Sequence, residues 1–504
     1  MRRLFLSLTA GLALGAWALE MPSFFSDDMI LQRESPVPVW GTAPAGQRVT
    51  VEFGGATAET TAGADGAWLA RLPAMPASKE GRELKVTADT ERTFRNVVVG
   101  DIWLCAGQSN MDWNLGGNTD GGRLVKESAN PHLRLLQIPH LWSRLPCRRF
   151  GEAVTEKGQP FAGAPAWRVC GPRTSGGFSA VGYLMGRELQ RELDIPVGLV
   201  KLAWGGCRVE SMCAPDSFAQ IPGLAGVVEL NRRLVAEMQA KAPDGSWQTD
   251  NETLYRKRNR YQRVHTALYN AMVLPLAPMA VRGMVWYQGE DNHYEGDIYA
   301  EKLKALAWTW RRAFGNPEMP IHIVLLPPYR YNMKAPYTTL SDRLPVFTDA
   351  QRRFAESDPH AGYIVTTDCG NVEDIHPREK RTLSARLARL ILLKTYGRGD
   401  DSALAPTFRA VVFDGPTATV SFNHPNGLRT TDGKAPSFVM LAGADGQFVP
   451  ADRTAIVGDT LVASAEAVPR PAFVSFGWSN IAQPNLVNRA GHPVMPFNSR
   501  RAGR

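Results

Sequence analysis

The segment Ile102-Trp103-Leu104-Cys105-Ala106-Gly107-Gln108-Ser109-Asn110-Met111 joins a continuous apolar run to a polar turn. Such a run followed by glycine is typical of a buried parallel strand that ends in a tight turn. Ligands bind at the carboxyl ends of strands in α/β sheets, which makes Ser109 a candidate nucleophile. Gly107 permits the sharp turn, and the peptide N–H groups beyond it are candidate donors to an oxyanion. Taken alone, the pattern also fits an ordinary polar turn.

Length and composition describe a globular protein with several domains. The chain has 504 residues, of which 44% are apolar and 21% charged, and one hydrophobic core does not usually support that length. The net charge of +8 arises from 57 basic and 49 acidic residues that are dispersed along the chain. This dispersed charge argues against nucleic acid as a partner.

The N-terminus has the pattern of a secretory signal peptide. Arg2 and Arg3 precede an apolar stretch, and Ala16-Trp17-Ala18 is a small-x-small cleavage site. We expect residues 1–18 to be removed after Ala18, leaving a soluble periplasmic or extracellular protein with no membrane span. A membrane anchor is the alternative, but the stretch is short and Glu20 follows it closely. An oxidising compartment would permit disulfides, although spacing fixes no pairing among Cys105, Cys147, Cys170, Cys207, Cys213 and Cys369.

The pattern of apolar residues predicts an α/β protein with small β-domains at both ends. Residues 19–95 alternate apolar and polar side chains between turns, which predicts an N-terminal β-domain. Residues 96–402 alternate apolar strand candidates with helical stretches, which predicts a parallel sheet flanked by helices. Residues 403–504 return to short alternating runs and predict a C-terminal β-module. The central strand candidates are 97–99, 195–202, 281–287, 321–326 and 363–366, and a helix is expected from about 380 to Gly397.

Three further polar constellations are candidate partners of Ser109. Trp204-Gly205-Gly206 follows an apolar strand, and its glycines would let a backbone N–H approach a reacting oxygen. Gln288-Gly289-Glu290 follows another strand, where a side-chain amide is a candidate oxyanion donor. Glu373-Asp374-Ile375-His376-Pro377 supplies an imidazole base with acids two and three positions before it. Each constellation alone also fits an ordinary loop.

Together these blocks resemble the SGNH hydrolase superfamily, and more closely its sialate O-acetylesterase family. The resemblance rests on Gly107 to Met111, Trp204 to Gly206, Trp286 to Glu290 and Asp374 to Pro377, in the family's order. It extends over nearly all of the mature chain. The fold that it implies is a central SGNH-type parallel sheet flanked by helices.

The resemblance implies an O-acetyl ester hydrolase that acts on acetylated sugars. Ser109 would be the nucleophile and His376 the base, and an acetyl-enzyme would form and be hydrolysed. The oxyanion would be held by the N–H groups of Ser109 and of Gly206 or Gly205, and by the Gln288 amide. No cofactor or metal is expected, and the nine histidines show no metal-binding spacing.

The acid of the triad departs from the superfamily pattern. The usual position, three residues before the histidine, holds Glu373, whereas Asp374 lies two before. We favour Asp374 as the group that orients His376, with Glu373 or a backbone carbonyl as alternatives.

The sugar is specified less closely than the reaction. Trp204 and Trp286, together with Trp113, lie beside the catalytic blocks and are candidates to stack on a sugar ring. Arg208 is a candidate partner for the carboxylate of sialic acid, although Glu210 is an internal alternative. An acetylated xylan or other polysaccharide is the second substrate hypothesis. A non-catalytic carbohydrate-binding protein is the hypothesis from another class.

Overall fold

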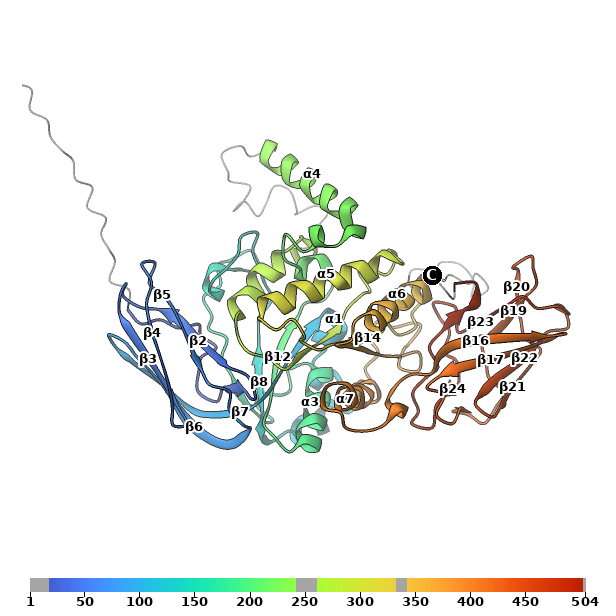
Figure 1. The fold of residues 1–504 in the computed structure, drawn as a ribbon, viewed down its shortest axis with the longest axis horizontal. Coiled ribbons are helices and arrows are strands. Elements are labelled where there is room, and N and C mark those ends of the chain that lie inside the picture. The colour runs from blue at the N-terminus through green and yellow to red at the C-terminus, as the bar shows by residue number, and fades with distance from the viewer. Residues whose placement is uncertain (1–17, 242–260, 332–341, 502–504) are drawn as a thin grey trace, which may run out of the picture.

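The molecule is elongated, with three parts arranged along its longest axis (Figure 1). This computed structural model describes residues 18–241, 261–331 and 342–501. An N-terminal β-region and a C-terminal β-region lie at opposite ends of a central α/β region, as the sequence pattern predicts. The signal-peptide prediction for residues 1–18 falls almost entirely outside the described residues.

The centre is a largely parallel sheet whose strands carry buried, apolar side chains on both faces. Its only antiparallel neighbour along the described path is the edge strand β11 (Arg168–Cys170). Beyond β11 the strand order is β8 (Asn130–Gln137), β12 (Val197–Ala203), β7 (Glu91–Gly107), β13 (Gly283–Tyr287), β14 (Ile321–Val324) and β15 (Ala361–Ile364). The predicted parallel sheet is therefore confirmed. The sequence pattern does not predict β8, because Arg134 interrupts its apolar run.

Helices cover both faces of this sheet. Figure 1 shows α5 (Ile298–Ala313) and α6 (Arg343–Ser357) on one side, and α3 (Ala180–Leu193) and α7 (Arg381–Tyr396) on the other. Helix α7 ends at Gly397, which adopts the left-handed conformation with φ 63°, as expected for a C-terminal cap.

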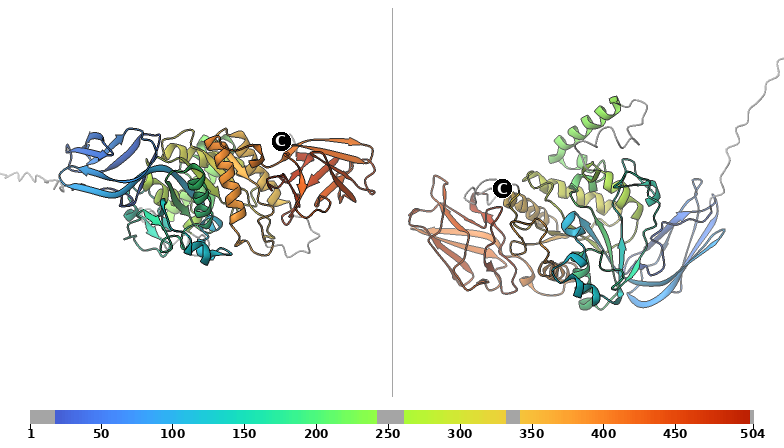
Figure 2. Two further views of the ribbon diagram at one scale, coloured as in Figure 1. Left: turned by 90° about the horizontal axis from the view of Figure 1, so that it is seen from below. Right: turned by 180° about the vertical axis from the view of Figure 1, so that it is seen from behind.

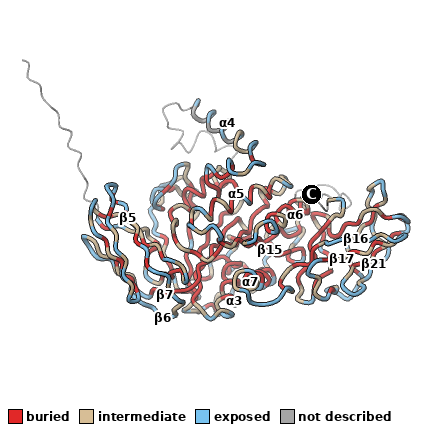
Figure 3. The backbone as a smooth tube through the Cα atoms, viewed as in Figure 1, coloured by how far each residue is buried: buried red, intermediate tan, exposed pale blue. Residues whose placement is uncertain are grey.

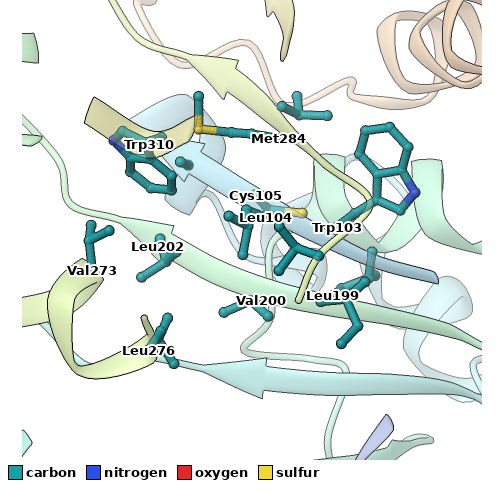
Figure 4. Close-up of a cluster of buried hydrophobic side chains, with 14 of the residues drawn as sticks. Trp103, Leu104, Cys105, Leu199, Val200, Leu202, Val273, Leu276, Met284 and Trp310 are labelled. Carbon is teal, nitrogen blue, oxygen red and sulfur yellow. The ribbon is translucent and has the colours of Figure 1, made fainter. Parts of the chain in front are cut away.

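The core of the central region lies where β7, β12 and β13 run side by side (Figure 4). Side chains such as Trp103 and Trp286 are fully buried there. Both flanking strands pair with β7 as far as Gly107, so the carboxyl ends of three strands meet at one edge. Ser109 follows this edge directly.

The N-terminal β-region shares its hydrophobic core with the centre. Strand β7 spans both, pairing with β6 (Ser78–Thr87) and β1 (Ile30–Gln32) before it enters the parallel sheet. Strands β3 (Arg48–Phe53) and β4 (Ala56–Thr61) extend the same sheet, and β2 (Val37–Thr42) pairs with β5 (Ala67–Leu72). One continuous cluster of buried residues contains side chains from Leu19 to Ala405, together with Met495 from the C-terminal region.

The C-terminal β-region has a core of its own, formed by residues between Ala418 and Phe497. Figure 3 shows buried backbone both in this region and in the centre of the molecule. The C-terminal β-region has two four-stranded sheets. The first has the order β16 (Thr407–Asp414), β17 (Thr417–Asn423), β22 (Thr460–Ser464) and β21 (Arg453–Val457). The second has the order β20 (Phe448–Pro450), β19 (Val439–Ala442), β23 (Phe473–Phe476) and β25 (Phe497–Asn498).

Helix α4 (Ala225–Lys241) projects from the body of the molecule (Figure 2). It lies in a stretch rich in charged residues, from about 215 to 262, of which residues 242–260 lie outside the described part. All six cysteines are described; each is buried and none is paired. No helix in the described ranges has the length and apolarity needed to cross a membrane.

Candidate active site

Ser109 begins the short helix α1 (Ser109–Asp112) directly after β7. Gly107 has φ 146°, and a Cβ placed on it would lie 2.1 Å from the carbonyl oxygen of Tyr287. Only glycine fits this contact between β7 and β13 without displacing a strand. The Gln108 N–H donates to the same carbonyl at 3.1 Å, which fixes the turn that presents Ser109.

His376 lies against Ser109, as the sequence predicts. Its Nε2 is 2.8 Å from the serine Oγ, and its loop connects β15 to α7. The indole of Trp113 stacks on the imidazole with ring centroids 5.8 Å apart. Burial lowers the pKa of His376, while the charge of Asp374 opposes that shift. A lowered pKa favours the neutral imidazole, which is the form that accepts a proton from serine.

Neither acid of the His376 loop, Glu373 or Asp374, is hydrogen-bonded to His376 Nδ1, where the third member of a triad would lie. The exposed Asp374 carboxylate accepts the backbone N–H of His376 at 2.9 Å. Glu373 is also exposed and forms an ion pair with Arg330. Within the described residues, no carboxylate or carbonyl accepts a hydrogen bond from His376 Nδ1. The geometry is therefore a Ser-His dyad, with Asp374 acting on the backbone of the loop.

The turn after β12 brings glycine backbone close to Ser109. A Cβ placed on Gly205 would lie 3.3 Å from the Ser109 Cβ, and Gly206 adopts φ 73°. In the described part of the chain the N–H groups of Ser109 and Gly206 donate to no acceptor. These are the two backbone donors predicted for an oxyanion.

Gln288 does not have the predicted role of an oxyanion donor in this geometry. It is fully buried, and its amide nitrogen donates to Cys207 O and to Asn292 Oδ1, both at 2.9 Å. Its Oε1 accepts the hydroxyl of Tyr299. Because both amide hydrogens are in use, Gln288 holds the glycine turn through Cys207 rather than a reacting oxygen.

The predicted sugar-contacting residues also have other partners. Trp286 is fully buried and donates to the hydroxyl of Tyr299, so it is a core residue. The Arg208 guanidinium is paired with Glu295 and Glu210, the internal partner that the sequence offers. Trp204 is only 6% exposed, because the imidazole of His140 stacks on it at 4.9 Å.

Comparison with known proteins finds similarity to acetylesterases that act on carbohydrates. A family model described as carbohydrate esterase, sialic acid-specific acetylesterase, matches residues 233–392. The sialate O-acetylesterase of Rattus norvegicus is 29% identical over 406 residues, which cover 72% of this chain and 71% of that protein. The crystal structure of a carbohydrate acetylesterase from Xanthomonas citri is 31% identical with a TM-score of 0.80, and the match covers 95% of this chain and 99% of the other.

The chain belongs to the sialate O-acetylesterase family. It is thus a carboxylic ester hydrolase with the mixed α/β fold of that family, as the resemblance implies. Within the described residues, no group of three or more His, Cys, Asp or Glu side chains is arranged to hold a metal ion.

A buried polar network in this esterase connects the nucleophile turn to the histidine loop. The Asn110 amide nitrogen donates to Glu290 Oε1 at 2.6 Å and to the carbonyl of Ile375 at 3.0 Å. Its oxygen accepts a hydrogen bond from Lys380 Nζ at 2.6 Å. Burial raises the pKa of Glu290 and lowers the pKa of Lys380 to about 8. The roles of Asn110 and Lys380 in this network cannot be predicted from the sequence, because their partners come from distant segments.

A second polar cluster lies on the other side of α1. Asp112 contacts Lys201 Nζ at 2.6 Å and His140 Nε2 at 3.1 Å, and His140 Nδ1 is 3.3 Å from Glu156. Burial opposes these contacts, but the bonds from His140 and Lys201 hold the pKa of Asp112 below its usual value. The cluster fixes the ring that covers Trp204.

Proposed function

We propose that this protein is a carbohydrate O-acetylesterase that uses Ser109 as nucleophile and His376 as general base. The observation that carries the proposal is the 2.8 Å contact between Ser109 Oγ and His376 Nε2, beside two unused backbone donors. Nucleophile and base within hydrogen-bond reach are the geometric requirement for acyl transfer through serine. The similarity to carbohydrate acetylesterases supports the choice of an acetyl group.

In the proposed reaction, Ser109 Oγ attacks the acetyl carbonyl while His376 Nε2 takes its proton. The resulting oxyanion accepts the N–H groups of Ser109 and Gly206, each worth about 3 kcal/mol in the transition state. His376 then returns the proton to the departing sugar hydroxyl, leaving acetyl-Ser109. Water attacks this ester with His376 again as base, which releases acetate and restores the serine.

The imidazolium formed in each step requires electrostatic support. The proposal assigns that support to the Asp374 carboxylate, which raises the pKa of His376 through space. Because Asp374 binds the backbone N–H of His376, it also holds the loop that presents the ring. A Ser-His-Asp arrangement with a bond from Nδ1 to Asp374 is the alternative form of this proposal.

Two substrate classes follow from different observations. The names of the related proteins favour acetylated sialic acid. The ion pairs of Arg208 favour a neutral acetylated polysaccharide such as acetylxylan, because the charge of this arginine is already balanced by carboxylates of the protein.

Acetate release from acetylated sialic acid and from acetylated xylan, measured side by side, tests the proposal. Turnover of either substrate supports an O-acetylesterase, and the ratio of the kcat/KM values selects the class. Inactivity on both substrates and on simple acetyl esters, with retained glycan binding, would favour a non-catalytic carbohydrate-binding protein instead.

Export is part of the proposal. Arg2, Arg3, the apolar stretch after them and the Ala16-Trp17-Ala18 site support secretion to the periplasm or the medium. Cell fractionation with N-terminal sequencing tests it: Leu19 as the first residue of the exported protein is expected. A cytoplasmic protein that retains Met1 would contradict it.

A further inference from the structure

Asn110 is the residue next to the proposed nucleophile, and its side chain is hydrogen-bonded inside the protein. It is completely buried, and its side-chain partners come from two other segments, the turn after β13 and the histidine loop between β15 and α7. Glu290 follows β13, Lys380 precedes α7, and Ile375 lies in the histidine loop. One carboxamide therefore joins three segments that meet only in the folded protein.

The two charged groups determine how the amide is oriented. Glu290 Oε1 accepts from the amide nitrogen, whereas Lys380 Nζ donates to the amide oxygen. A carboxylate at the positive end of the amide dipole and an ammonium at its negative end both favour the observed orientation. If the amide were flipped, its oxygen would face the Glu290 carboxylate and its nitrogen the Lys380 ammonium, and both hydrogen bonds would be lost.

In this orientation the amide nitrogen bonds the Ile375 carbonyl, one residue before His376. Ser109 precedes Asn110 directly, so the two reacting residues are attached to the two ends of one hydrogen bond. Further contacts join the same segments: Lys380 N donates to Asn118 Oδ1 at 3.0 Å, and Thr119 N to Arg378 O at 3.3 Å. The spacing between Ser109 and His376 therefore depends on this seam.

We propose that Asn110, held by Glu290 and Lys380, is the positioning residue that sets the distance between Ser109 Oγ and His376 Nε2. The inference rests on the proposed function and deepens it. Asn110 touches neither substrate nor reacting atoms; it acts through the backbone at Ser109 and Ile375. A displacement of about 1 Å between reacting groups costs on the order of 100-fold in rate.

The test compares Asn110→Ala and Glu290→Ala with wild type. Each variant should lower kcat by about 10- to 100-fold and leave KM within about twofold, because the substrate contacts remain. Labelling of Ser109 by a fluorophosphonate should slow in parallel, since it needs the same Ser-His pair. Glu290→Gln keeps an oxygen acceptor for the Asn110 amide and should restore most of the rate.

Asn488→Ala is the matched control. Asn488 is also completely buried, and its side chain bonds backbone groups of Ser402, Leu404, Ala490 and His492, but it lies in the C-terminal region. It should lower the melting temperature as Asn110→Ala does and leave kcat unchanged. If Asn110→Ala does not fold, the ratio between Glu290→Gln and Glu290→Ala gives the same comparison.

Unchanged kcat and labelling in folded Asn110→Ala or Glu290→Ala would overturn the inference, whatever the loss in melting temperature. Failure of the proposed function has a different signature. If wild type is labelled at Ser109 but releases no acetate from sugars, the proposed substrate is wrong. The labelling rates of wild type and the Asn110 and Glu290 variants then still test the positioning role. A wild-type enzyme that neither labels nor hydrolyses removes both.

Discussion

Ser109 and His376 can be found from the sequence because each follows a strand or precedes a helix with a clear apolar pattern. Gln288, Trp286 and Arg208 have internal partners in the structure that their local sequence does not predict. Their roles depend on partners such as Tyr299 and Glu295, which no local pattern brings near them. A polar side chain beside a catalytic block is thus not evidence that it faces the substrate.

The first prediction concerns the charge of His376. Because burial lowers its pKa, the neutral base persists below pH 6.5, and the acidic limb of kcat/KM should have its midpoint below that value. Asp374 raises this pKa, so Asp374→Asn should move the limb to still lower pH. A fall of about 10⁴-fold in kcat would instead show that Asp374 binds Nδ1 during catalysis. The measurement is a pH profile of both proteins.

The turn of Gly205 and Gly206 after β12 leaves little room beside Ser109. Gly205→Ala places a Cβ 3.3 Å from the Ser109 Cβ and should reduce kcat/KM by about tenfold through a small displacement of the nucleophile. Gly122→Ala in helix α2 (Gly121–Lys126) meets nothing within 4 Å and is the control. It should leave activity unchanged and stabilise the protein by about 0.5–1 kcal/mol. Equal activity of the two variants would refute crowding at Ser109.

At the level of elements, β7 carries both the nucleophile turn and a buried acid near its middle. Asp101 is completely buried and accepts hydrogen bonds from Arg33, Arg282, Gln32 and Tyr396, which connects the N-terminal region to α7. The sequence predicts these elements well from their apolar pattern. It does not predict this network, because the donors come from three segments that are far apart in the chain: Gln32 and Arg33, Arg282, and Tyr396.

Asp101→Ala leaves two guanidinium groups without their shared carboxylate and should destabilise the protein by about 3–5 kcal/mol. Urea unfolding measures the change. The kcat of the fraction that remains folded should equal that of wild type, because Asp101 lies far along β7 from Ser109. A change below about 1 kcal/mol would contradict this role for Asp101.

For the whole molecule, the sequence predicts two terminal β-regions, and the structure shows that they differ in kind. The N-terminal region shares the central core, whereas the C-terminal region has a core of its own and meets the centre near Met495, which belongs to the central cluster. His492 is completely buried at this contact. Its Nε2 accepts the N–H of Val365 at 3.2 Å, and its Nδ1 donates to Ala403 O at 3.0 Å.

Burial lowers the pKa of His492 well below 6.5. The unfolded chain therefore binds a proton at a pH where the folded protein does not, so His492 makes the protein less stable as pH falls below about 6.5. The slope from this one group is about 1.4 kcal/mol per pH unit. His492→Gln should reduce the pH dependence of unfolding between pH 6 and 4 by about that amount. An unchanged slope would contradict it.

The most direct measurement is acetate release from a small acetyl ester by wild type and Ser109→Ala side by side, with a metal chelator present throughout. We expect turnover by wild type and a loss of at least about 10³-fold in kcat for the variant, because the nucleophile is gone while the fold remains. Comparable activity of the two proteins would contradict the assignment of Ser109.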